Sequence, residues 1–276
     1  MGLTEEGRGS WLWPFRQSPR PDKESSSGER PEPVCGSRAF DIADALEGGL
    51  ARDDTTDIML PLRKLSRLFK FHVKRSEDMR HYRLYCDDGE FIMYARLAPG
   101  GQRVDFSQYD PLDGGHAGLY DPERPAFRMT CNESRSEWRL VKERLDHCNC
   151  ARKHVPCDCR GNMEVARIRQ STQDIGDGTG NEMEVELAAM DDEARGRRLV
   201  TKMPTWNDEV GSLVLDFKGR RVQASAKNFQ LTQEGSEKHL VCQHCKIAPN
   251  TFSLDFRFPL SAVQAFAVSL TTLSWT

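Results

Sequence analysis

The stretch that decides the fold runs from residue 252 to residue 270 and reads FSLDFRFPLSAVQAFAVSL. Its first seven residues alternate, with four apolar side chains on one face and Ser253, Asp255 and Arg257 on the other. This period of two predicts a β-strand with one buried side and one solvent-facing side. Pro259 ends that strand and suits the first turn of a helix.

Residues 260–270 place apolar side chains on every side of a helix. Such a helix is either a membrane span or fully buried, and a span needs about 18 apolar residues. This run is too short, so we expect a buried helix. Because the rest of the chain consists of short strand patterns, the expected place is the inside of a closed barrel. The small side chains of Ala262, Ala265 and Ala267 would let the strands approach it closely.

Strand patterns precede this stretch from residue 69 onward. Phe69, Phe71 and Val73 alternate with polar residues, and Asp88-Gly89 between two strand-like runs predicts a hairpin. Further strand candidates are residues 127–131, 138–141, 163–168, 183–187, 213–217 and 222–225. No long helical patterns separate them, which favours antiparallel pairing. The predicted fold class is mainly β, a closed antiparallel β-barrel around a central hydrophobic C-terminal helix.

The chain divides into a tail and one domain. Residues 1–60 are the tail, which we expect to be largely disordered because residues 9–38 are rich in Ser, Pro, Arg and Glu. Residues 61–276 form the barrel domain, with irregular loops expected near 145–160 and 170–198. The tail also contains a helix candidate at 39–50.

Two segments near the start leave alternatives open. The apolar cluster at residues 11–15 is either a short motif for a partner or membrane surface, or a chance cluster or contact with its own domain. Residues 62–70 are either a basic amphipathic helix for an anionic membrane or a lead-in to the first strand with a solvated basic face.

The net charge and the absence of certain sequence motifs exclude several classes of protein. The formal net charge of -3 gives no global reason to expect nucleic acid, so a polyanion site must be a local patch. No apolar stretch follows the first residues as in a secretory signal, which predicts an intracellular protein with reduced cysteines. Phosphate-loop, nucleophile-elbow and His-Glu-x-x-His motifs do not occur, so we expect no enzyme and no cofactor.

Cysteines form two clusters. Cys148, Cys150, Cys157 and Cys159, with His154 as an alternative ligand, are a candidate zinc site, and the competing interpretation is a loop of reduced thiols. Residues 242–245 read CQHC. On a strand they would point alternately to two faces, one of them buried, which indicates structural thiols.

Three segments carry a resemblance to a known family. Residues 202–208 (KMPTWND), 217–230 (FKGRRVQASAKNFQ) and 256–267 (FRFPLSAVQAFA) are similar to tubby and tubby-like proteins. The resemblance is strongest over 202–273. Upstream it is limited to strand order and the Asp-Gly hairpin. The chain departs from the family at Arg221, where the family has an apolar residue, at Val222 and Ala226, and at residues 273–276.

The resemblance implies a phosphoinositide-binding, membrane-associated adaptor in the cytoplasm, with the plasma membrane, cilium or nucleus as its expected places. Its tail would link a partner or cargo protein, and no nucleic acid is expected. Phosphates need charge-assisted, preferably bidentate donors. The family has a dense basic run where this chain reads RLAPGGQR, so Arg96 and the nearby Arg103 are the candidate phosphoinositide-binding residues. The alternative is a degenerate barrel that acts as a protein-interaction scaffold without lipid binding, or with the structural zinc site.

Overall fold

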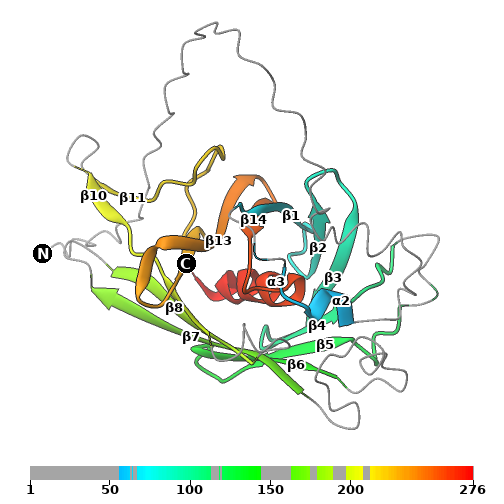
Figure 1. Cartoon of the computed structure of the whole chain (residues 1–276). Coiled ribbons are helices and arrows are strands. Elements are labelled where there is room, and N and C mark those ends of the chain that lie inside the picture. Colours follow the sequence, from blue (N-terminus) through cyan, green and yellow to red (C-terminus); the bar gives the residue numbers. More distant parts are fainter. Residues whose placement is uncertain are drawn as a thin grey trace, which may run out of the picture.

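The computed structural model describes residues 56–62, 64, 67–112, 118, 120–143, 163–174, 179–188, 197–207 and 212–275. Within these ranges, twelve antiparallel strands close into one barrel, in the order β1-β14-β13-β12-β9-β8-β7-β6-β5-β4-β3-β2 (Figure 1). The strands are β1 (Phe69–Arg75), β2 (His81–Cys86), β3 (Phe91–Leu97), β4 (Arg103–Ser107), β5 (Phe127–Cys131), β6 (Glu137–Lys142), β7 (Met163–Asp174), β8 (Thr179–Leu187), β9 (Arg198–Thr201), β12 (Phe229–Gln233), β13 (Ser236–Ala248) and β14 (Thr251–Phe256). Strands β10 (Thr205–Asn207) and β11 (Ser212–Val214) form a separate two-stranded sheet. The predicted mainly β barrel is confirmed.

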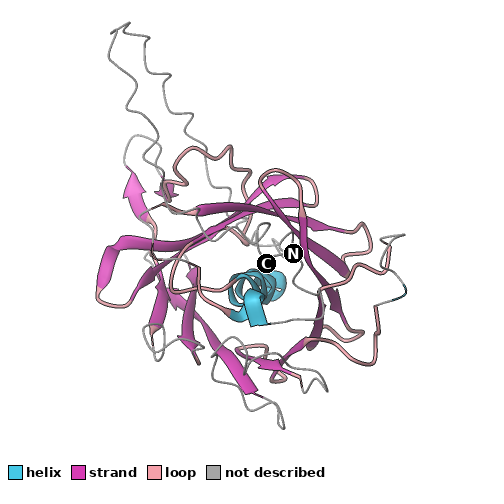
Figure 2. Cartoon of the chain, turned by 45° about the vertical axis from the view of Figure 1, so that its right-hand side comes forward, coloured by secondary structure: helices cyan, strands magenta, loops and turns pink. Residues whose placement is uncertain are grey.

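Helix α3 (Ala262–Thr271) lies inside the ring of strands (Figure 2). All its residues are buried, which confirms the expected central helix. Ser261 caps its start, where Ser261 and Gln264 exchange side-chain and backbone hydrogen bonds in a capping box. Pro259 therefore precedes the cap, and its predicted place in the first turn is wrong. A short helix α2 (Thr56–Met59) precedes the barrel, and a 3-10 turn, η2 (Thr272–Ser274), follows α3.

The predicted solvent-facing side of the strand at 252–258 is wrong. Ser253 and Asp255 on β14 are buried, and the Asp255 carboxylate accepts hydrogen bonds from Arg220. Arg220 belongs to the segment of residues 216–228, which lies against the outer side of the barrel here. Polar side chains are stable in this dry layer because they pair with one another.

Residues 242–245 are also more buried than predicted. Like Asp255, they lie near the segment of residues 216–228, which we call the covering layer. All four are buried on β13, so both faces of the strand are dry and not one as expected. Gln243 donates to Asp255 at 2.8 Å, and the Cys245 thiol lies 3.0 Å from the Ser253 hydroxyl. Burial raises the pKa of both Cys242 and Cys245, which keeps the thiols protonated. The candidate strand at 222–225 is not a strand but part of the covering layer.

Part of the loop expected at 170–198 is instead a long hairpin. Strand β7 continues to Asp174 and β8 begins at Thr179. Its outward residues are polar because they pair across strands, as Arg169 does with Glu184 at 3.3 Å. Opposite charges facing each other stabilise a sheet despite weak apolar patterning.

The described residues of the basic stretch 62–70 form a lead-in to β1, which begins at Phe69. The backbone N–H of Leu62 donates to the Leu260 carbonyl at 3.1 Å, which ties this lead-in to the approach to α3. The amphipathic-helix alternative is not what the described residues form.

Several predictions fall outside the described residues. These are residues 1–55 of the tail with its cluster at 11–15, the helix at 39–50, the irregular stretch 145–160 and, within it, Cys148, Cys150, His154, Cys157 and Cys159. The end of the predicted tail is described and contains α2, where Ile58 and Met59 are buried. Where the chain is described, no three or more His, Cys, Asp or Glu side chains gather as a metal site would require. In the same ranges, none of the helices has the length and apolar character needed to cross a membrane.

A buried histidine makes stability depend on pH. His244 on β13 stacks on Phe252, with ring centroids 5.2 Å apart, and burial lowers its pKa from 6.5 to about 3. The unfolded chain binds a proton below pH 6.5 and the folded chain does not, so stability falls as pH decreases from 6.5 toward 3. Between pH 7 and pH 5 this residue should remove about 2 kcal/mol of the free energy of unfolding.

Urea denaturation of the wild type and of His244→Gln at both pH values measures this contribution. The fall in stability from pH 7 to pH 5 should be smaller in the variant by that amount. Equal falls in the two proteins would show that His244 takes up a proton in the folded state.

Candidate functional site

A row of ionisable side chains crosses the outer wall of four neighbouring strands. The strand register places His81 on β2 opposite Arg96 on β3, Arg96 opposite Asp105 on β4, and Asp105 opposite Arg128 on β5. Inward-facing neighbours such as Val104 and Phe106 on β4 are buried, so each strand contributes its alternate residues to this row. The barrel wall thus holds these four groups in line on a rigid surface.

Three arginines surround the carboxylate of Asp105, which is only 5% exposed. Arg128 Nε donates to Asp105 Oδ1 at 2.9 Å, and its Nη1 lies 3.0 Å from Glu143. Arg103 Nε and Arg96 Nη2 approach the other oxygen, Oδ2, at 3.3 Å and 3.7 Å. We call Arg96, Arg103 and Arg128 the arginine cluster.

The two outer members of the cluster are held loosely. Among the described residues Asp105 Oδ2 accepts no hydrogen bond, so Arg96 and Arg103 share one oxygen by charge alone. Their side chains are 32% and 47% exposed. Both guanidinium groups therefore remain within reach of an anion from solvent.

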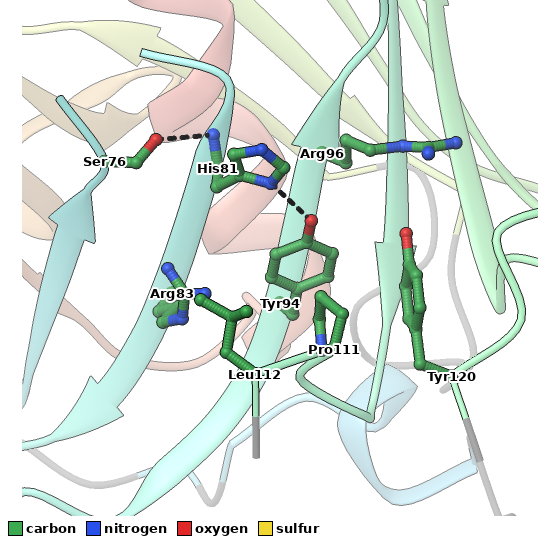
Figure 3. Close-up of a pocket in the computed structure, with 8 residues that line it drawn as sticks. All are labelled: Ser76, His81, Arg83, Tyr94, Arg96, Pro111, Leu112 and Tyr120. Atoms are coloured by element: carbon green, nitrogen blue, oxygen red, sulfur yellow. Dashed lines mark hydrogen bonds between the residues drawn. The ribbon is translucent and has the colours of Figure 1, made fainter. Parts of the chain in front are cut away.

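A pocket of about 300 Å3 adjoins the cluster and includes Arg96 in its wall (Figure 3). Its lining residues are Ser76, His81, Arg83, Tyr94, Arg96, Pro111, Leu112 and Tyr120. His81 Nδ1 and the Tyr94 hydroxyl are 2.6 Å apart, and the Tyr94 and Tyr120 rings meet edge to face at 5.4 Å. The pocket combines aromatic walls with cationic and polar groups.

Hydrogen bonds and burial fix the charge states of two pocket residues. Arg83 pairs with Asp110 through two hydrogen bonds, and this contact raises the pKa of the guanidinium. Burial raises the pKa of Tyr94 further above its usual range, so its hydroxyl is a neutral hydrogen-bonding group. Arg83 is neutralised by its partner, which leaves Arg96 as the pocket arginine with the weaker counter-charge.

The charged residues on the wall formed by β7, β8 and β9 differ from this cluster. Arg198 on β9 contacts three carboxylates, those of Glu184, Glu186 and Glu234, at 2.9, 3.2 and 3.5 Å. Arg169 on β7 contacts Glu184 and Glu186. Positive charge is therefore compensated on the β7–β9 wall and under-compensated at Arg96 and Arg103.

The structure brings the two predicted residues, Arg96 and Arg103, together at one carboxylate. Sequence reasoning missed Asp105 and Arg128, which complete the cluster. Strand β4 was not predicted, although Val104 and Phe106 alternate there with polar residues and could have indicated it. The predicted zinc ligands Cys148, Cys150, Cys157 and Cys159 lie outside the described residues, so the zinc site stays a hypothesis.

Comparison with known proteins places this architecture in a family. The family model described as Tub family matches residues 127–274. Tubby protein homolog 1 of Caenorhabditis elegans is 50% identical over 74 residues, which are 27% of this chain and 17% of that protein. Tubby-related protein 2 of Mus musculus is 49% identical over 74 residues (27% and 13%), and Tubby-related protein 1 of Homo sapiens 46% over 74 residues (27% and 14%).

Each alignment thus spans less than a fifth of the relative's own length. The family match begins at the first residue of β5, so it includes Arg128 while Arg96, Arg103 and Asp105 precede it. The matched region contains eight of the twelve described barrel strands and the buried helix, and it covers more than half of the chain. The chain therefore belongs to the Tub family.

Proposed function

We propose that this chain is a non-enzymatic tubby-like module that binds a membrane phosphoinositide head group at Arg96, Arg103 and the adjoining pocket. It would act as a cytoplasmic adaptor at the membrane surface, with the part of the N-terminal tail that precedes α2 available to a protein partner or cargo. The observation that supports the proposal most is the pairing of Arg96 and Arg103 on one shared carboxylate oxygen. Two partly exposed guanidinium groups with one counter-charge form a local anion site in a chain that is acidic overall.

The chemistry of the two groups fits phosphate. A guanidinium presents planar N–H donors that match phosphate oxygens in pairs, and such charge-assisted bonds are about twice as strong as neutral ones. The neighbouring pocket supplies aromatic walls beside Arg96, against which the ring of an inositol could pack. Hydrogen-bonding groups at His81 and Tyr94 lie in the same wall.

Replacing both arginines, Arg96→Gln and Arg103→Gln, should weaken vesicle binding strongly. Each basic residue near an anionic surface contributes about 1 kcal/mol, so the double variant should bind roughly 30-fold more weakly or worse. The measurement is co-sedimentation of the full chain with vesicles that contain a bisphosphorylated phosphoinositide in a neutral lipid. Neutral vesicles and vesicles matched in charge with phosphatidylserine are the lipid controls.

A matched protein control is available on the wall formed by β7, β8 and β9. Arg169→Gln with Arg198→Gln makes the same change in net charge at side chains that are similarly exposed. It should leave binding within about twofold of the wild type, because those arginines are already compensated. Equal losses in the two double variants, or equal wild-type binding to all three vesicles, would contradict a specific site and favour the scaffold alternative.

A further inference from the structure

The arginine cluster contains its own competing anion. Asp105 lies in the row of outward residues between Arg96 and Arg128, nearly buried, and its carboxylate occupies the place toward which three guanidinium groups converge. An incoming phosphate at Arg96 and Arg103 must share these two cations with Asp105 Oδ2. The inference that follows rests on the proposed anion binding at this site.

The contacts to Asp105 differ in strength. Arg128 makes a hydrogen bond of 2.9 Å to Oδ1, whereas Arg96 and Arg103 reach Oδ2 at longer distances and without a hydrogen bond in the described part of the chain. A charge-assisted hydrogen bond is stronger than an unaligned ion pair. Arg128 is therefore the arginine that stays with Asp105, and the other two are the ones that a ligand can recruit.

Arg128 also limits the negative charge that Asp105 presents to the outside. Its guanidinium bridges Asp105 and Glu143, and the hydrogen bond to Asp105 raises the pKa of Arg128, which keeps it charged. Without Arg128, the full charge of a nearly buried carboxylate would act on Arg96 and Arg103. Charges in such a site are poorly screened by water, so they act strongly at short range.

We propose that Asp105 sets the anion affinity of this site by competing with the ligand for Arg96 and Arg103, and that Arg128 positions Asp105 and weakens that competition. Because the Oδ2 contacts are loose, the repulsion of an incoming phosphate outweighs the help that Asp105 gives in aligning the two arginines. The affinity would then be held below what three converging arginines can reach, and binding would be readily reversible.

The test is a double-mutant cycle on the full chain. The probes are vesicles that contain a bisphosphorylated phosphoinositide and, in separate titrations, free inositol trisphosphate, so that a lipid surface and the soluble head group are distinguished. Asp105→Asn should bind both probes about tenfold more tightly, which corresponds to about 1.4 kcal/mol. Arg128→Gln should bind more weakly than the wild type although it is not a ligand contact. In the Asp105→Asn background, Arg128→Gln should have much less effect.

Glu184→Gln is the matched control, since Glu184 is a carboxylate shared by Arg169 and Arg198 on the β7–β9 wall. It makes the same change in net charge and should alter binding less than twofold. If Asp105→Asn binds no more tightly than the wild type while Arg96→Gln with Arg103→Gln abolishes binding, Asp105 is not a competitor, and the proposed function stands.

Other outcomes separate the two ideas further. If the wild type binds neither probe, the proposed function fails first. Additive effects of Asp105→Asn and Arg128→Gln would show that Arg128 does not act through Asp105. Circular dichroism melting of each variant identifies any that do not fold, and Arg128→Gln tests the idea without altering Asp105 itself.

Discussion

Arg220→Ala will lower the free energy of unfolding by about 3–5 kcal/mol, the range found when one partner of a buried ion pair is removed. Arg220 places two nitrogens on the carboxylate of Asp255, which is buried between residues 216–228 and β14, and the Arg220 side chain is itself only 14% exposed. Without Arg220, the hydrogen bond from Gln243 would be the remaining support for a buried charge. The hydrogen bond to Asp255 also raises the pKa of Arg220, consistent with a permanently charged pair.

Guanidinium chloride or urea denaturation at pH 7 measures the loss. Arg221→Ala is the matched control, because Arg221 is the next residue and is exposed, and it should change stability by less than about 0.5 kcal/mol. Replacing the acid as well, in Arg220→Ala with Asp255→Asn, should recover part of the loss by removing the unpaired charge. A loss in Arg220→Ala no larger than in Arg221→Ala would mean that the covering layer is not held by this pair.

Phe266→Ala should cost about 3–5 kcal/mol through the cavity that it leaves in the barrel. Phe266 is fully buried in α3 and meets Phe106 of β4 edge to face, with ring centroids 5.7 Å apart. Alanine is the best helix former, so the substitution does not weaken α3 itself, and the loss reports packing. The surrounding ring of strands is closed, which limits how far the walls can move inward.

The same denaturation experiment tests this change, with Leu112→Ala as a control that removes an apolar side chain which is 79% exposed. That control should shift stability by less than about 0.5 kcal/mol. Near-wild-type stability of Phe266→Ala would indicate that the barrel collapses onto the shortened side chain, contrary to a rigid closed wall.

The central helix could be predicted because its signal is local. Residues 260–270 are apolar all round and too few to span a membrane, so burial follows from one segment of sequence. The spacing of Ser261 and Gln264 also fits a capping box, a signal that the predicted place of Pro259 in the first turn did not take into account. The buried outer face of β14 could not be predicted in this way, because Asp255 is dry only when Arg220 arrives from a segment 35 positions earlier.

Part of the candidate site could be predicted from the sequence and part could not. Arg96 and Arg103 could be selected from a family resemblance, but their meeting at Asp105 depends on the register between β3 and β4. Arg128 enters through the register of β4 with β5. Register depends on pairing between strands and on turns, and it is not visible in the alternation within one strand. Residues 170–174 are expected to be loop because they are polar, yet they pair with residues 179–183, as Ser171 does with Glu182 at 3.2 Å.

The position of α3 in the chain has a consequence for how the protein is made. All twelve barrel strands leave the ribosome before the helix that fills them, and β1 pairs with β14, the last strand to emerge. The apolar inner faces of the early strands therefore stay exposed until α3 has been synthesised and β1 has paired with β14. Pairing between strands so far apart in the sequence is slow. During that interval the nascent chain exposes unpaired strand edges, so chaperone binding and translation rate should govern the yield of this domain more than its final stability does.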